Sequence, residues 1–199
     1  MHKNRKKGLF MNRMPFLFVI CGLVLVGNLF SQSTESSKNL VENPSFEETD
    51  AKGNLLAWEA VKNGYQISPD VFRSGKQSML LKGEKIVGGV RRNIDVPEPG
   101  CKLRFKANLY IKSFSSGVLK PIHVSFISAG KTYYRPQVNL FPDQKSLRKN
   151  VWVEYTAELD LSGFPDVEKI VLWCLGYAHN KYGSFTGEVY IDDLSLERF

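Results

Sequence analysis

Aromatic and planar polar side chains recur on strand-like segments in the middle of the chain, and these residue types could bind a sugar. Alternation of apolar and polar residues places Tyr110, His123 and Trp152 on the open faces of three such segments. A tyrosine or tryptophan ring packs against the C–H face of a pyranose, and planar polar groups hydrogen-bond its hydroxyls. The candidate ligand-binding residues are Tyr110, His123, Tyr133, Arg135, Gln137 and Trp173. We expect Tyr110 to stack on the sugar while neighbouring polar side chains such as His123 and Arg135 hold its hydroxyls.

The same aromatic residues have structural interpretations that remain open at this point. Large aromatic rings are usually buried, so Trp152 could be a packing residue of the core rather than a ligand-binding residue. Trp173 lies in a segment that is apolar at both parities, so either face of its strand could be the inner one. Tyr133 and Tyr134 point to opposite faces of a strand, so at most one of them can stack on a ligand.

The elements that must position these residues are short β-strands. Period-two alternation runs through Leu103–Ile111, Ile122–Phe126 and Val151–Leu159, and each pattern indicates a strand with one buried face. Turn signals rich in Gly, Pro, Asn and Asp separate the strand-like segments, and the body has no long stretch of period 3.6. The pattern predicts an all-β fold, an antiparallel β-sandwich in a single domain.

The distribution of charge excludes a nucleic-acid partner. The chain has 27 basic and 20 acidic residues, but residues 1–31 hold five basic residues and no acidic one. Residues 32–199 therefore carry 22 basic and 20 acidic residues, which gives little electrostatic attraction for phosphates.

The N-terminus has the order of a secretory signal. Basic residues precede the apolar run Phe16–Val26, and we place signal cleavage after Ser31. The run is shorter than the ~20 residues that span a bilayer, so no membrane span is expected after cleavage, although an uncleaved anchor stays open. Residues 32–38 form a polar linker, 39–199 form the sandwich, and the protein is expected to be secreted or to lie in the cell envelope. In that oxidising space Cys101 and Cys174 could pair as a disulfide or remain buried thiols.

Four segments in order resemble the CenC-type carbohydrate-binding modules, which belong to the galactose-binding-like jelly rolls. They are Asn39–Glu47 followed by Trp58, Phe72–Leu80, Pro99–Lys112 and Glu188–Leu196. The last segment, Glu-Val-Tyr-Ile-Asp-Asp-Leu-Ser-Leu, is similar to the family's closing motif. The resemblance implies a jelly roll that binds sugar, and it places Tyr110 where the family commonly has a tryptophan.

A structural calcium ion is the cofactor that the resemblance implies. The alternation of the last strand slips by one residue at Asp192-Asp193, which indicates a β-bulge that could aim a carboxylate inward. Carried over from the family, the calcium ligands are the carboxylates of Glu47 and Asp192 and the backbone of Ser45, all of them hard oxygen donors. The alternative is that the two aspartates protect an edge strand.

No catalytic motif accompanies these features. The sequence has no HExxH, no G-x-S-x-G and no metal-spaced Cys/His set. A small jelly-roll glycosidase would need two carboxylates ~5.5 Å apart, and Glu154 with Glu188 is the pair to test. We therefore expect a secreted, non-catalytic module that binds a poly- or oligosaccharide as a monomer. The alternatives are a β-sandwich for protein interaction and, third, the glycosidase.

Overall fold

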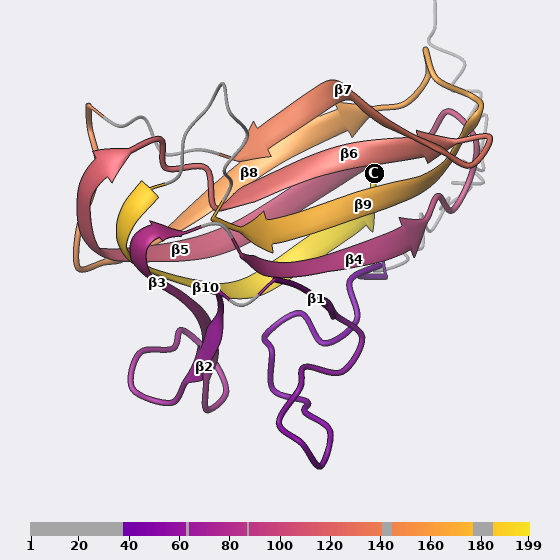
Figure 1. Ribbon diagram of the computed structural model, residues 1–199. Helices are drawn as coiled ribbons and strands as arrows, with labels where there is room; N and C mark the ends of the chain where they lie inside the picture. Colours follow the sequence, from indigo (N-terminus) through magenta and orange to yellow (C-terminus); the bar gives the residue numbers. More distant parts are fainter. Residues whose placement is uncertain (1–37, 63, 87, 141–144, 177–184) are drawn as a thin grey trace, which may run out of the picture. The chain divides into compact units, whose positions relative to one another are not determined.

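Ten strands follow one another along the chain in the computed structural model (Figure 1), and none of the described residues is helical. The described residues are 38–62, 64–86, 88–140, 145–176 and 185–199, and only the backbone is described for residues 85 and 131–140. The strands are β1 (Glu59–Val61), β2 (Gln66–Ser68), β3 (Ser78–Ile86), β4 (Gly89–Asp95), β5 (Lys102–Gly117), β6 (Ile122–Ser128), β7 (Lys131–Leu140), β8 (Trp152–Asp160), β9 (Val167–Leu175) and β10 (Phe185–Arg198).

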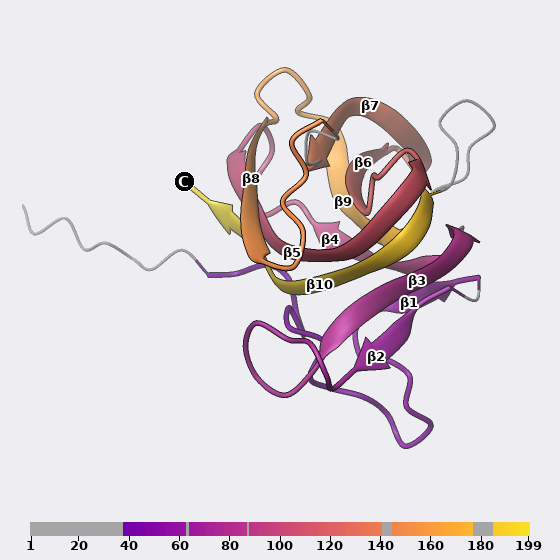
Figure 2. The same cartoon turned by 90° about the vertical axis from the view of Figure 1, so that its left-hand side faces the viewer.

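The strands form two five-stranded antiparallel sheets. The first sheet has the order β1-β4-β9-β6-β7, and the second has the order β2-β3-β10-β5-β8. Figure 2 shows β5 and β10 side by side in one layer, with β6 and β9 in the other. The all-β, two-sheet sandwich predicted from the alternation is therefore confirmed.

The core lies between the sheets and follows the period-two pattern. On β5, the side chains of Leu103, Phe105, Ala107, Leu109 and Ile111 are all buried, as the alternation predicted. They meet the inward side chains of the first sheet, such as Ile122, Val124, Ile170 and Leu172. The remaining positions of β5, including Tyr110, lie on the outer face of the second sheet.

The predicted bulge in β10 is confirmed. Asp192 lies opposite Asn108 on β5, but the next paired residue is Ser195, opposite Lys106. Asp193 has a φ of 48°, in the left-handed region, which accounts for the extra residue in the strand. Because of the bulge, Ile191 and Leu194 both face the core although their sequence parity differs.

The two cysteines are buried free thiols. Cys101 precedes β5 and Cys174 lies in β9, and both belong to the apolar core. Of the two possibilities that the sequence left open, the structure has the unpaired one. Within the described ranges, no helix is long and apolar enough to cross a membrane.

Candidate functional site

A row of polar and aromatic side chains crosses the outer face of the first sheet. The strand register aligns Glu59 on β1, Arg91 on β4, Trp173 on β9 and His123 on β6. These residues alternate with core residues such as Val90, so their side chains lie on the face opposite the core. We call these four residues the tryptophan row.

The indole of Trp173 is held from both sides within this row. The guanidinium of Arg91 lies 5.4 Å from the ring centroid, and the His123 ring is stacked at 5.5 Å with an interplanar angle of 9°. Because β4 and β6 flank β9 on opposite sides, the two groups cover opposite faces of the indole. The Trp173 Nε1–H donates to Ser125 Oγ at 2.9 Å. Trp173 therefore presents an edge rather than a free stacking face.

An ion pair completes one end of the row. Arg91 donates from Nε and Nη2 to the two carboxylate oxygens of Glu59, at 2.8 and 2.7 Å. These hydrogen bonds raise the pKa of Arg91 and lower the pKa of Glu59. A bidentate pair of this kind fixes two planar groups whose remaining donors and acceptors can bind hydroxyls.

His123 is neutral at physiological pH. Burial, with a smaller contribution from Lys120, lowers the pKa of its imidazole to about 4. A neutral imidazole has one donor and one acceptor nitrogen, which suits hydroxyl ligands. The row therefore offers hydrogen-bonding groups at its Glu59–Arg91 end, and at the other end His123 packs as a buried neutral ring against the indole of Trp173.

A polar pocket of about 490 Å³ adjoins the Arg91 end of the row. Arg92 reaches inward there, donating from Nη1 to the Ala57 carbonyl at 2.6 Å and pairing with Glu42 at 2.6 Å. Its buried Nε has no hydrogen-bond partner within the part of the chain that the structure describes. The pocket is lined by Glu42, Ala57, Trp58, Glu59, Arg91, Arg92 and Asn93.

The structure brings only some of the predicted ligand-binding residues together. His123 and Trp173 share the tryptophan row, whereas Tyr110 lies on β5 in the other sheet. The expectation that His123 and Arg135 would help Tyr110 to hold one sugar is therefore wrong, because β5 and β6 lie in different layers of the sandwich. For Arg135 the structure describes only the backbone.

Residues of β7 make up the rest of the predicted set. Tyr133 lies opposite Phe126 in the register, and Arg135 and Gln137 follow it on the same strand. Their side chains fall outside the described part of the structure, so their role in binding stays a prediction.

Sequence reasoning missed Arg91 and Glu59. The available signal was the alternation within β4, where Val90 and Ile94 are buried and Arg91 must face outward. The sequence did not reveal that Trp173 and Glu59 would flank Arg91, because that contact depends on the register of three strands.

One turn links two of the predicted calcium ligands. Asp192 is fully buried, and its Oδ2 accepts hydrogen bonds from the backbone N–H groups of Arg73 (2.8 Å) and Ser74 (3.2 Å). Burial raises the pKa of this carboxyl to about 6. Asp192 thus holds the start of the turn 73–77, which joins β2 to β3.

The other end of the same turn rests on Glu47. Its Oε1 accepts from the backbone N–H groups of Lys76 (2.8 Å) and Gln77 (3.1 Å). The hydroxyl of Ser45 donates to Asp193 Oδ1 at 2.7 Å, beside the bulge. Among the residues that the structure describes, no three His, Cys, Asp or Glu side chains converge, so a cation here would also need backbone oxygens.

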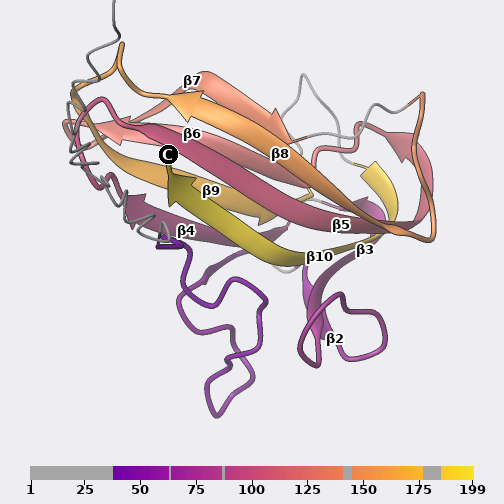
Figure 3. The same cartoon turned by 180° about the vertical axis from the view of Figure 1, so that it is seen from behind.

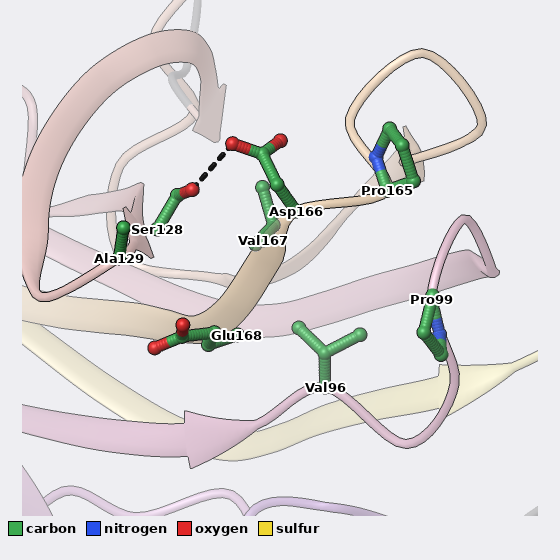
Figure 4. A pocket seen from close by; sticks show the side chains of 8 residues that line it. All are labelled: Val96, Pro99, Ser128, Ala129, Pro165, Asp166, Val167 and Glu168. Carbon is green, nitrogen blue, oxygen red and sulfur yellow. Dashed lines mark hydrogen bonds between the residues drawn. The ribbon is translucent and has the colours of Figure 1, made fainter.

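A second hollow, of about 370 Å³, lies among loops at the end of the first sheet (Figure 4). The Ser128 hydroxyl donates to Asp166 Oδ2 at 2.5 Å, and prolines and valines form the other walls. Ser128 is five residues from His123 on β6, or roughly 17 Å along the strand, so this hollow is separate from the tryptophan row.

The proposed glycosidase pair is not assembled. In the register, Glu154 on β8 is level with Asp192 on β10, and Glu188 precedes Asp192 by four residues on the same strand. Strand β5 lies between β8 and β10. Strand geometry puts the two backbones roughly 10 Å apart across the sheet and 13 Å along it, too far for paired carboxylates. Hydrogen bonds from Tyr190, Lys112 and Lys82 overcome the effect of burial and lower the pKa of Glu188 to about 2, which does not suit a general acid.

The solved structures that this chain resembles include xylan-binding modules. The CBM22-1 xylan-binding domain of Paenibacillus barcinonensis Xyn10C matches with a TM-score of 0.54 and 13% identity over 81% of this chain and 95% of that chain. The CBM22-1–GH10 modules of Clostridium thermocellum xylanase 10B, complexed with xylohexaose, match with a TM-score of 0.54 and 11% identity over 81% of this chain and 29% of that one.

A phage protein has the same fold over a similar length. The enzymatically active domain of bacteriophage CBA120 tailspike protein 4 matches with a TM-score of 0.57 and 14% identity over 81% of this chain and 21% of that chain. No family model matches the sequence, and no curated protein matches it. At these identities the similarity establishes the fold, a jelly-roll sandwich of the kind used by carbohydrate-binding modules.

Proposed function

We propose that this protein is a non-catalytic carbohydrate-binding module and that the tryptophan row is its binding face. The observation that carries the proposal is the alignment of Glu59, Arg91, Trp173 and His123 across four strands beside a polar pocket. This arrangement combines an aromatic edge with planar groups that hydrogen-bond hydroxyls. The fold similarity to a xylan-binding domain and to xylanase modules complexed with xylohexaose supports xylan fragments as the first ligands to test.

Calorimetric titration of the purified protein with xylohexaose tests this face. Arg91→Ala removes the guanidinium that packs on Trp173 and binds Glu59, and we expect affinity to fall about tenfold or more. Trp173→Phe keeps an aromatic ring but removes the indole N–H, which provides a milder second variant. The matched control is Lys169→Ala on the same strand, because Lys169 is exposed and, among the described residues, forms an ion pair with Asp95 alone, at 3.4 Å. If Arg91→Ala and Lys169→Ala bind each oligosaccharide with equal affinity, the tryptophan row is rejected as the binding face.

We further propose that calcium binds at the turn 73–77, as in the CenC-type modules. Glu47 and Asp192 hold the two ends of this turn, and the buried Asp192 carboxylate has backbone N–H donors but no basic side chain among its described partners. Its raised pKa is consistent with a buried negative charge that a bound cation would stabilise. The ion would join the chain segment before β1 to the bulge of β10.

The proposed site of action is outside the cytoplasm. The signal-like segment 1–31 supports export, and the similarity of the fold to modules of a xylanase complexed with xylohexaose fits a polysaccharide ligand outside the cytoplasm. N-terminal sequencing of the protein recovered from culture fluid or envelope should give a start near Gln32. An intact N-terminus retained in the inner membrane would instead establish a signal anchor.

A further inference from the structure

The outer face of the second sheet carries an aromatic row of its own. Tyr190 on β10, Tyr110 on β5 and Trp152 on β8 lie at the same level of the register. Figure 3 shows these three strands side by side. The ring centroids of Tyr190 and Tyr110 are 5.7 Å apart, and those of Tyr110 and Trp152 are 5.6 Å apart. We call these three residues the tyrosine row.

The outer end of the tyrosine row is open. Tyr190 is only 3% exposed, but Tyr110 and Trp152 are half-buried and lie outside the apolar core. β8 is the edge strand of its sheet, so Trp152 has a strand neighbour on one side only. Unlike Trp173, Trp152 has no second ring or guanidinium packed on it within the described residues. Part of an indole therefore remains available for a ligand.

A fixed carboxylate lies beside the inner end of the row. Glu188 Oε1 accepts from the Tyr190 hydroxyl at 2.5 Å and from Lys112 Nζ at 2.9 Å, and its Oε2 pairs with Lys82 at 3.3 Å. The side chains of Lys82 and Lys112 are 55% and 50% exposed, so their remaining N–H donors face solvent. Preorganised charged donors of this kind bind hydroxyls without further side-chain ordering.

The charges around the row balance. Arg73 pairs with Glu154 at 3.8 Å on the β8 side, and Asp70 is close enough to Lys112 to interact with it electrostatically. The basic residues of this group are Arg73, Lys82 and Lys112, and the acidic ones are Asp70, Glu154 and Glu188. With three charges of each sign, this group has no net charge, which fits a neutral, hydroxyl-rich partner.

An unsatisfied polar atom lies under the same face. Asn108 precedes Tyr110 by two residues on β5, so both side chains point outward, and Asn108 is 2% exposed. Its Oδ1 has no hydrogen-bond partner in the described part of the chain. A buried amide oxygen without a partner destabilises the free protein, so a hydroxyl or water that reached it on binding would be stabilised there.

We propose that the tyrosine row is a second, independent carbohydrate-binding face that takes a neutral pyranose chain. Trp152 and Tyr110 supply the aromatic surface, and Lys82, Glu188 and Lys112 hydrogen-bond the hydroxyls. The two rows lie on outer faces of different sheets, so one molecule can hold two glycan strands at once. This proposal stands on the residues of the second sheet and does not require binding at the tryptophan row.

The three tryptophans of the chain allow each face to be observed separately. Trp173 reports on the first face and Trp152 on the second, and Trp58, which is 8% exposed and lines the pocket beside the first face, belongs with Trp173. Indole N–H resonances of the ¹⁵N-labelled protein, assigned with single Trp→Phe variants, would be followed during titration with xylohexaose, cellohexaose and mannohexaose. We expect a saturable shift of the Trp152 resonance with at least one of them, up to about 10 mM ligand.

Variants decide whether that shift arises at the second face. Tyr110→Ala should weaken the binding reported by Trp152 about tenfold or more and leave the Trp173 titration unchanged. Thr156→Ala is the matched control, because Thr156 is exposed on the outer face of β8 but lies outside the row. In Trp173→Phe the Trp152 titration should persist.

Three outcomes would overturn the proposal. They are a Trp152 resonance that stays still with all three oligosaccharides, a shift that Tyr110→Ala and Thr156→Ala alter equally, and a shift that Trp173→Phe abolishes. If only the Trp173 resonance shifts, the second face alone is rejected. If only the Trp152 resonance shifts, the tryptophan row alone is rejected.

Discussion

At the scale of single residues, His123 makes stability depend on pH. Its pKa is lowered from 6.5 to about 4, chiefly by burial, so the native protein keeps it neutral where the unfolded chain protonates it. Between pH 6.5 and 4 the unfolded state binds more protons, and stability therefore falls as pH falls through this window. The full contribution is up to about 3 kcal/mol, present above pH 6.5 and lost towards pH 4.

His123→Phe isolates this contribution, because phenylalanine keeps a ring beside Trp173 but does not titrate. Urea unfolding between pH 7 and 4 should show the wild type losing stability relative to the variant as the pH drops. A constant difference in unfolding free energy between the two proteins across this range would contradict the burial of a neutral imidazole.

Tyr110 contributes to stability through its neighbours. Its outward parity, predicted from the alternation on β5, is confirmed, but its ring contacts both Tyr190 and Trp152. An outward position alone would predict almost no loss of stability for Tyr110→Ala, whereas two ring contacts predict a loss of about 1–2 kcal/mol. Lys106→Ala, on the same face of the same strand, should change the free energy of unfolding by less than about 0.5 kcal/mol. Urea midpoints that match in the two variants would show that the ring contacts contribute nothing.

At the scale of elements, the turn 73–77 depends on a glycine. Gly75 has a φ of +67°, and a Cβ there would lie 2.2 Å from Glu47 Oε1. Gly75→Ala should therefore both strain the backbone and displace the carboxylate that binds Lys76 and Gln77.

Gly130→Ala separates these two effects. Gly130 has a φ of +72°, but a Cβ there would meet none of the described atoms within 4 Å, so we expect this variant to have the backbone strain alone. Thermal unfolding should show the larger loss for Gly75→Ala, by at least about 1 kcal/mol. Equal losses would mean that Glu47 moves aside without consequence.

The sequence predicted single strands better than contacts between them. Period-two alternation is a property of one strand, so the buried face of β5 and the bulge at Asp192 could be recognised from local sequence. β5 nevertheless continues to Gly117, beyond the predicted alternation, because β10 pairs with it that far. The hydrogen bonds of a partner strand can extend a strand past the end of its hydrophobic pattern.

The candidate site was harder to predict because it depends on strand order. Arg91 and Trp173 are 82 positions apart in the chain, and they meet only because β4 pairs with β9 in one particular register. The same limitation explains the incorrect grouping of Tyr110 with His123, since parity reveals which face a residue occupies in its own sheet but not which sheet that is. The resemblance to CenC-type modules indicated the fold and left the ligand-binding side chains undetermined.

At the scale of the whole molecule, the segment before β1 is tied to the end of the chain. The Leu40 N–H donates to the Leu196 carbonyl at 2.8 Å, and the Asn39 side chain donates to the Leu194 carbonyl at 3.0 Å. The Ser45 hydroxyl adds a contact to Asp193 across the bulge. Unfolding must break these long-range links, so an ion that binds at the same junction would stabilise the whole sandwich.

Calcium should therefore raise the melting temperature. An ion that binds only the folded state adds about 2.7 kcal/mol at a concentration one hundred times its Kd, which corresponds to roughly 5–10 °C for a domain of this size. Differential scanning calorimetry in EDTA and in added calcium measures this difference directly.

Asp192→Asn is the sharper variant, because an amide oxygen can still accept from the Arg73 and Ser74 N–H groups while the buried charge is removed. Without calcium, the removal of a costly buried charge is offset in this variant by the loss of the oxygen that accepts from the Asp193 N–H, so its melting temperature should stay close to that of the wild type and should no longer respond to calcium. A wild-type midpoint that is the same in EDTA and in calcium would leave Asp192 as a structural acceptor for the turn and reject the metal site.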